Sequence, residues 1–185
     1  MRDIRVALLR SILIAGRRVS GADARAMAEA AGGTEVRSII ATGNVVFRST
    51  RPVADLERDM EAACVASFGK PTEIVVRTAE SWRALVAANP FPTEALDNPA
   101  RLLAWAMRSP LPDAGLERLR ARACGPERVE RTADGDFYCW FGENPIAGSR
   151  LASAFALKSL GAVGTNRNWN TVGKISAAIM DMARS

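Results

Sequence analysis

The spacing of apolar residues along this chain changes between two periods, and the order of the changes occurs twice. Strands alternate apolar and polar residues every second position, whereas helices keep one apolar face with a period of 3.6. The first half reads strand, helix, strand, strand, helix, strand, over residues 4–10, 21–31, 36–40, 44–48, 53–67 and 73–77. That order predicts a ferredoxin-like βαββαβ unit, with an antiparallel sheet and both helices on one face.

The same order recurs in the second half. Strands are predicted over 101–107, 127–131, 136–141 and 162–165, and helices over 112–123 and 150–160. We therefore predict an α+β fold of two ferredoxin-like halves, 1–78 and 101–185. A linker helix and a Pro-containing linker over 79–100 join them, and an extra C-terminal helix spans 172–183.

Short local signals mark where these elements begin and turn. Ser20, Thr78 and Ser149 each precede a helical pattern and are predicted to cap it. Thr42 and Gly43 lie between two strand patterns and predict a hairpin turn.

The predicted strand at 136–141 is unusual because both of its alternating faces are apolar or aromatic. A sheet with helices on one side and water on the other alternates apolar with polar residues. We therefore predict that its second face is covered, by the other half, the linker helix or the last helix. The alternative is a surface on which RNA bases stack.

Composition narrows the chemistry that the chain can carry. The 185 residues include no histidine, which excludes Ser-His and Cys-His pairs and histidine metal ligands. The net charge is +5, but the 22 arginines and 3 lysines are spread along the whole chain. This balance permits binding to phosphates or nucleic acid without marking a basic patch.

The cysteines and the apolar runs indicate a cytoplasmic location. Cys64, Cys124 and Cys139 are odd in number and form no CxxC spacing, which fits a reducing compartment. We predict each to be a small buried hydrophobic residue, and expect neither a metal nor a cofactor. No apolar run approaches the ~20 residues that cross a bilayer, and residues 1–9 are interpreted as a first strand rather than a signal peptide.

Three segments carry a family resemblance: residues 6–10 with the Gly-containing loop after them, residues 42–47, and residues 165–172 with Lys174. Together they resemble DUF1697, a bacterial family of uncharacterised proteins, which also has a tripeptide like the one at 89–91. The resemblance implies the duplicated ferredoxin-like architecture and no reaction. Ser11 and Leu13 depart from it, since family members usually have Gly and Asn there.

The strongest candidate site is the polar segment that leads into the last helix. Helix N-termini offer free N–H groups and a positive dipole end, which suit an anion. Arg167 can clamp a phosphate, Trp169 can stack on a ring, and Lys174 can add charge. Asn168 and Thr171 complete the set. In the alternative interpretation, Asn170 or Thr171 only caps the helix and the other side chains serve the fold.

Two further segments supply candidate residues. The loop over 10–18 contains Arg10, Arg17 and Arg18 before a helix start, which suits an anion or is simply a solvated basic loop. Asn44, after Gly43, is a candidate for which a tight turn is the alternative.

The sequence thus predicts a small binding protein for an anionic ligand, which is a phosphate-containing small molecule, a nucleotide or RNA. One alternative is a structural or interaction protein, and another is an enzyme without histidine, for which no catalytic motif is found. The carboxylates of Glu57, Asp59 and Glu61 are interpreted as a solvated face. A monomer and a homodimer are both compatible with these patterns, and no membrane partner is expected.

Overall fold

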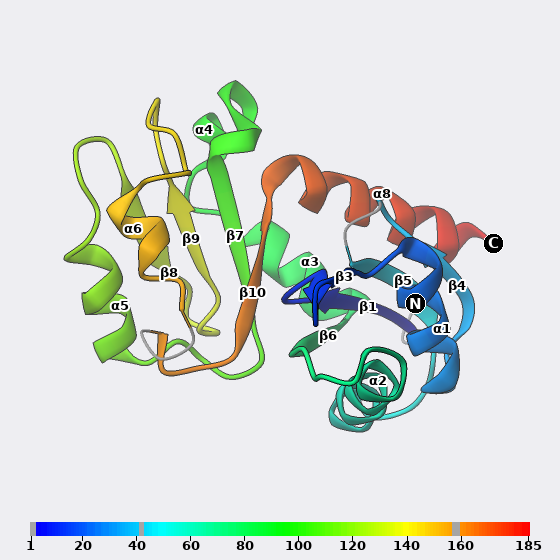
Figure 1. Ribbon diagram of the computed structural model, residues 1–185. Helices are drawn as coiled ribbons and strands as arrows, with labels where there is room; N and C mark the ends of the chain where they lie inside the picture. The colour runs from blue at the N-terminus through cyan, green and yellow to red at the C-terminus, as the bar shows by residue number, and fades with distance from the viewer. Residues whose placement is uncertain (1–2, 41–42, 157–159) are drawn as a thin grey trace. The chain divides into compact units, whose positions relative to one another are not determined.

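The computed structural model describes residues 3–40, 43–156 and 160–185 and has a mixed α/β fold with antiparallel sheets (Figure 1). It divides into two compact units. The first comprises Met1–Ala84 with Gly173–Ser185, and the second comprises Leu85–Val172.

The first unit is built on a four-stranded sheet in the order β4-β5-β1-β6, with every neighbour antiparallel. Its strands are β1 (Ile4–Leu9), β4 (Thr34–Ser38), β5 (Asn44–Arg48) and β6 (Ile74–Thr78). Helices α1 (Gly21–Ala30) and α2 (Val53–Phe68) fall between them in the predicted order. A small hairpin of β2 (Leu13–Ile14) and β3 (Arg17–Arg18) follows β1, where the sequence predicts a loop.

The second unit repeats this chain order around a sheet in the order β10-β7-β9-β8. Its strands are β7 (Leu102–Met107), β8 (Arg128–Arg131), β9 (Phe137–Trp140) and β10 (Gly164–Asn168). Helix α5 (Asp113–Arg120) is shorter than predicted, and α6 (Arg150–Ser153) ends much earlier than the predicted 150–160, of which 157–159 lie outside the described residues.

The segment between the two predicted halves is more ordered than its prolines suggest. After α3 (Ala79–Ala87) come α4 (Pro92–Asp97) and a 3₁₀ turn, η1 (Pro99–Arg101). Each of these short helices has proline in its first positions, where the missing N–H is not needed. The prolines at 92 and 99 therefore start helices instead of only ending one.

All three predicted caps are confirmed. Ser20 Oγ accepts a hydrogen bond from the Asp23 N–H, and the Asp23 carboxylate accepts one from the Ser20 N–H, which is a capping box. Thr78 Oγ1 accepts from the Ser81 N–H at 3.0 Å, and Ser149 accepts from the Ala152 N–H. The predicted turn at 42–43 is described only from Gly43 onward, whose φ is +71°.

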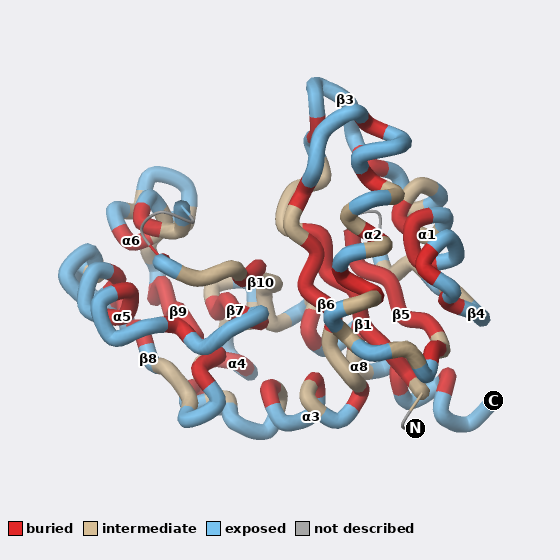
Figure 2. Tube along the Cα trace, turned by 90° about the horizontal axis from the view of Figure 1, so that it is seen from below, coloured by how far each residue is buried: buried red, intermediate tan, exposed pale blue. Residues whose placement is uncertain are grey.

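The sheet of the first unit is covered on both faces, so that all six residues of β1 are buried. One face packs against α1 and α2 through residues such as Leu9, Phe47 and Met60. On the opposite side lie α3 and the last helix, α8 (Trp169–Arg184) (Figure 2). Within this unit the Trp82 indole N–H donates to Ser176 Oγ at 3.0 Å.

The aromatic strand of the second unit is also buried on both faces. On one face Trp105 stacks on Phe137 with ring centroids 5.0 Å apart. On the other face Tyr138 is 0% exposed and its hydroxyl donates to the Leu85 carbonyl oxygen of α3. The predicted covering of this strand is confirmed, and a base-stacking surface at Tyr138 is wrong because the ring is inaccessible.

The free edge of β6 is closed by two carboxylates of α2. Glu61 Oε1 accepts from the Ile74 N–H and Glu57 Oε1 accepts from the Val76 N–H, each at 2.9 Å. Residues four apart on a helix and two apart on a strand have similar spacings, so both acceptors reach their amides. The solvated-face interpretation is therefore wrong for Glu57, which is 6% exposed.

The cysteines follow the prediction in part. Cys64 and Cys139 are buried, and burial raises the pKa of both thiols. Cys124 is exposed, so its predicted burial is wrong: it lies in the connection after α5 rather than on a core-facing position.

The described residues contain neither a helix that could span a membrane nor a cluster of metal ligands. None of their helices combines the length and the apolar character that crossing a membrane requires. Among the same residues, no three or more Cys, Asp or Glu side chains gather in a way that can hold a metal ion.

The hydrogen bond that Glu57 accepts from the edge strand β6 predicts a large effect of replacing Glu57 on stability. Glu57→Ala leaves a buried amide N–H without its acceptor and should lower the free energy of unfolding by about 1–3 kcal/mol. Glu57→Gln retains an acceptor oxygen and should lose less, and Glu29→Ala, on the exposed side of α1, serves as the control. Urea unfolding gives the free energy of unfolding of all three variants. If Glu57→Ala lowered it no more than Glu29→Ala does, the hydrogen bond from β6 to Glu57 would not stabilise the fold as described.

The covering of the second face predicts a contrast between neighbours on α8. Ile179 is 2% exposed and Met180 is 54% exposed. Ile179→Ala should lower the free energy of unfolding by about 2–5 kcal/mol, because a cavity adds to the lost burial. Met180→Ala should change it by less than about 0.5 kcal/mol. Equal effects at the two positions in thermal or urea unfolding would show that α8 is not docked as described.

Candidate functional site

The predicted polar segment forms a direct strand-to-helix junction, with β10 ending at Asn168 and α8 beginning at Trp169. Asn168 Oδ1 accepts from the Thr171 N–H at 3.0 Å and from the Thr171 hydroxyl at 2.9 Å. Asn168 is therefore the helix cap, rather than Asn170 or Thr171. This cap explains why the helix begins three positions earlier than the predicted 172.

Arg167 precedes the cap and has a half-buried guanidinium group. Its Nη1 donates to Thr165 Oγ1 at 3.0 Å and to the Asn166 carbonyl oxygen at 2.6 Å. Burial lowers the pKa of Arg167 to about 10. The group still carries its charge at neutral pH, so the protein holds a partly desolvated cation beside a helix start.

Trp169 follows the cap and is also half-buried. Its ring centroid lies 6.4 Å from that of Tyr138, with the two planes tilted by 57°. Lys174, one turn further along α8 than Thr171, is exposed. The junction thus places a guanidinium, an indole and a helix N-terminus within a few residues of one another.

The candidates near the N-terminus lie in the first unit and have structural contacts of their own. Arg17 Nη1 donates to the Ser67 carbonyl oxygen at 3.0 Å, and its guanidinium carbon lies 4.7 Å from the centre of the Phe68 ring. Both partners belong to the last turn of α2, whose free carbonyl groups favour a cation. Arg17 therefore serves the end of a helix, while Arg18 is exposed.

Arg10 and Asn44 flank the same end of the first sheet. Arg10 is half-buried; burial lowers its pKa, and nearby Glu73 opposes that effect. Asn44 is 0% exposed and donates from Nδ2 to the Ile39 carbonyl oxygen at 3.1 Å. A Cβ at Gly43 would stand 3.0 Å from Leu9 Cβ, so the Gly43–Asn44 pair fits the predicted tight turn.

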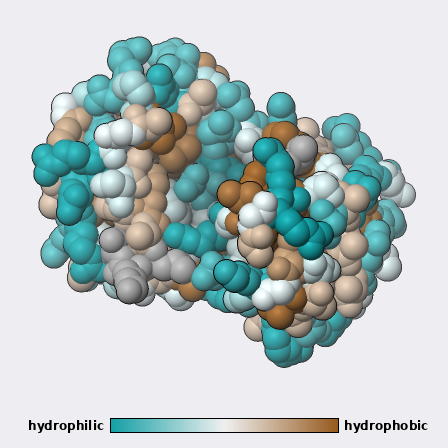
Figure 3. All heavy atoms as spheres, viewed as in Figure 1, coloured by the Kyte–Doolittle hydropathy of each residue, from teal (hydrophilic) through white to brown (hydrophobic). Residues whose placement is uncertain are grey.

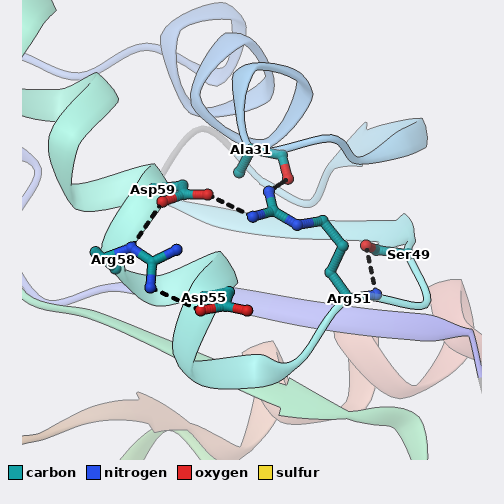
Figure 4. Close-up of polar contacts among 6 residues, drawn as sticks. All are labelled: Ala31, Ser49, Arg51, Asp55, Arg58 and Asp59. Atoms are coloured by element: carbon teal, nitrogen blue, oxygen red, sulfur yellow. Dashed lines mark hydrogen bonds and ion pairs between the residues drawn. The ribbon is translucent and has the colours of Figure 1, made fainter.

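A polar network that sequence reasoning missed lies at the start of α2 (Figure 4). Arg51 donates to Asp59 at 2.6 Å and to the Ala31 carbonyl oxygen at 2.5 Å. Arg58 pairs with Asp55 at 2.6 Å and with Asp59 at 3.0 Å. The three-residue spacing of Asp55 and Arg58 was the only sequence signal for it.

A pocket of about 280 Å³ adjoins this network and is lined by Arg48 and Arg51. Arg48 pairs with Asp3 at 2.9 Å and with Glu35 at 3.0 Å. The carboxylates already compensate both guanidinium groups, so this pocket offers an anion little uncompensated charge. Hydrophilic residues are likewise spread over both units, rather than gathered in one patch, in the face shown in Figure 3.

Two of three comparisons with known proteins relate the chain to others. The family model described as a protein of unknown function, DUF1697, matches residues 3–138. No curated protein matches the sequence. Among solved structures, the conserved bacterial protein SP0830 from Streptococcus pneumoniae is similar over 95% of this chain and 97% of its own, with 19% identity and a TM-score of 0.73. At that identity the likeness shows the fold alone, and the family match stops before the β10–α8 junction.

The α2 network predicts an acid-sensitive contribution to stability. The hydrogen bond from Arg51, with Arg58 adding to it, lowers the pKa of Asp59 below 3.8 in spite of partial burial. The contribution is therefore complete above about pH 4 and disappears as the pH falls through the lowered pKa. Asp59→Asn should lower the Tm at pH 7 and flatten the fall of Tm below about pH 4. If thermal melts showed the Tm of Asp59→Asn falling below about pH 4 as steeply as that of the wild type, Asp59 would not be the source of this acid sensitivity.

Proposed function

The chain belongs to the DUF1697 family of proteins of unknown function, and we propose that it binds an anionic ligand at the β10–α8 junction. The observation that carries the proposal is the half-buried guanidinium of Arg167 directly before the capped start of α8. Holding a cation out of water is unfavourable, and a bound anion offsets part of that cost. The N-terminal end of a 16-residue helix adds partial positive charge at the same place.

The ligand class follows from what stands beside the cation. Trp169 is only half-buried, so part of the residue is accessible to a ligand. An indole stacks on planar rings, and a guanidinium binds phosphate oxygens in a bidentate manner. A molecule that joins a ring to a phosphate, as a nucleotide does, uses both groups. Lys174, Arg10, Arg17 and Asn44 lie in the first unit, and their part in ligand binding stays a prediction.

A structural function is the second candidate, favoured by the contacts that these residues make within the second unit. Trp169 packs near Tyr138, and Asn168 caps α8. In this case the junction stabilises the fold and has no ligand. The two candidate functions predict different effects of replacing Arg167 on the stability of the ligand-free protein.

The proposal also extends to the architecture and the setting. We propose that each half is a ferredoxin-like unit, which the repeated chain order and the equivalent strand orders β4-β5-β1-β6 and β10-β7-β9-β8 support. A cytoplasmic location, and a monomeric or homodimeric state, complete the proposal.

Binding of ATP, with adenosine and inorganic phosphate as its two halves, tests the function by isothermal titration calorimetry at low and moderate salt. We expect ATP to bind more tightly than either half and to weaken as salt rises. Arg167→Met should weaken ATP binding at least about 10-fold, which is about 1.4 kcal/mol. Arg37→Ala, which removes an exposed arginine from β4, is the charge-matched control and should leave binding unchanged.

The melting temperature of the same variants separates the two candidates. If Arg167 is held for a ligand, Arg167→Met removes a desolvated charge and should leave the Tm of the free protein unchanged or raised. If Arg167 serves the fold, the Tm should fall by several degrees. A lowered Tm together with no binding of ATP or of a labelled RNA oligonucleotide to the wild type would overturn the proposed function in favour of the structural one.

A further inference from the structure

The second unit carries a thiol in a different setting from that of the other two cysteines. Cys124 is exposed after the end of α5 and lines a pocket of about 320 Å³ together with Arg150 and Ser149 of the α6 start. Cys64 and Cys139 are buried. A reagent in solution therefore meets only one of the three sulfurs directly.

One guanidinium group lies beside this sulfur, and two more belong to residues shortly before it in the chain. Arg150 Nη1 lies 4.0 Å from Cys124 Sγ. A second pocket, of about 160 Å³, is lined by Arg118 of α5, by Arg122 in the connection that leads to Cys124, and by Ser153 of α6. All three arginines are exposed, so this part of the second unit favours the approach of a negatively charged molecule, with Arg150 next to the thiol itself.

A buried carboxylate fixes the thiol relative to Arg150. Glu127 is 7% exposed, and its Oε2 accepts from the Cys124 N–H at 2.9 Å. Its Oε1 accepts from the Ser149 hydroxyl at 2.7 Å, and Ser149 caps the helix that begins with Arg150. Both carboxylate oxygens are thus engaged by the protein, and they tie together the two segments that carry the sulfur and the guanidinium.

We propose that Cys124 is a site of reversible thiol modification, at which it exchanges with the disulfide bond of a small anionic disulfide. The Cys124 thiol gives its proton to solvent, and the thiolate attacks one sulfur of the reagent. The bond between the reagent's two sulfurs breaks, and the other half leaves as a thiolate. The product is a mixed disulfide held in the pocket beside Arg150. This inference is independent of ligand binding at the β10–α8 junction.

The reaction of the reduced protein with two disulfides of opposite charge tests the proposal. Oxidised glutathione is anionic and cystamine is cationic, and intact-protein mass spectrometry gives the rate of adduct formation with each. We expect one adduct per chain, located on Cys124 by peptide mapping and absent in Cys124→Ser. Arg150→Gln should slow the reaction with oxidised glutathione by about 3- to 10-fold while leaving the rate with cystamine unchanged or raised, and added salt should shrink this difference.

Arg37→Gln is the charge-matched control and should change neither rate. Adducts on Cys64 or Cys139 in place of Cys124 would overturn the proposal. Equal slowing of both reagents by Arg150→Gln would also overturn it, because the guanidinium would then act on the thiol alone and not select an anionic reagent. An unchanged melting temperature of Arg150→Gln confirms that each result reports on reactivity rather than on folding.

Discussion

The second face of the first sheet is closed by a helix from the far end of the chain, and the first unit depends on that closure. Ile4, Val6 and Leu8 point away from α1 and α2 and are nevertheless 0% exposed. Apolar area removed from water stabilises a fold by roughly 25 cal/mol per Å², so these side chains require a cover. Helix α8 covers them, and Arg48 of β5 binds this helix by donating a hydrogen bond to the Met182 carbonyl oxygen at 2.6 Å. The first unit is therefore complete only when residues from both ends of the sequence have met.

Charged side chains serve the backbone throughout the structure. Glu57 and Glu61 bind amides at the edge of β6, and Arg17 binds a carbonyl group at the end of α2. In the second unit Arg120 donates to the Val129 carbonyl oxygen of the edge strand β8 at 3.3 Å. Such contacts give a histidine-free, arginine-rich chain a structural use for its charges, and a net charge of +5 alone is no argument for a nucleic-acid partner.

The two proposed sites rest on different parts of the second unit and on different chemistry. The β10–α8 junction combines a half-buried cation with an aromatic ring, which suits a ligand that binds without reacting. The Cys124 pocket combines a nucleophile with the exposed guanidinium of Arg150, which suits an anionic reagent that forms a bond. Cys124 lies within residues 3–138 that match the family, whereas Arg167 lies beyond them. A result that refutes one of the two proposals therefore leaves the other unaffected.

The sequence by itself determined what depends on neighbours along the chain. The order of strands and helices, the caps at Ser20, Thr78 and Ser149, and the polar junction around Arg167 could be predicted, because periodicity and capping act over a few residues. Tertiary structure alone decided the role of Glu57, the exposure of Cys124 and what covers β1. Glu57 is one carboxylate among several on its helix until β6 brings an unbonded amide to it, and β1 is buried only when α8 arrives. Burial and hydrogen-bond partners belong to pairs of segments far apart in sequence, and no local pattern records which segments will meet.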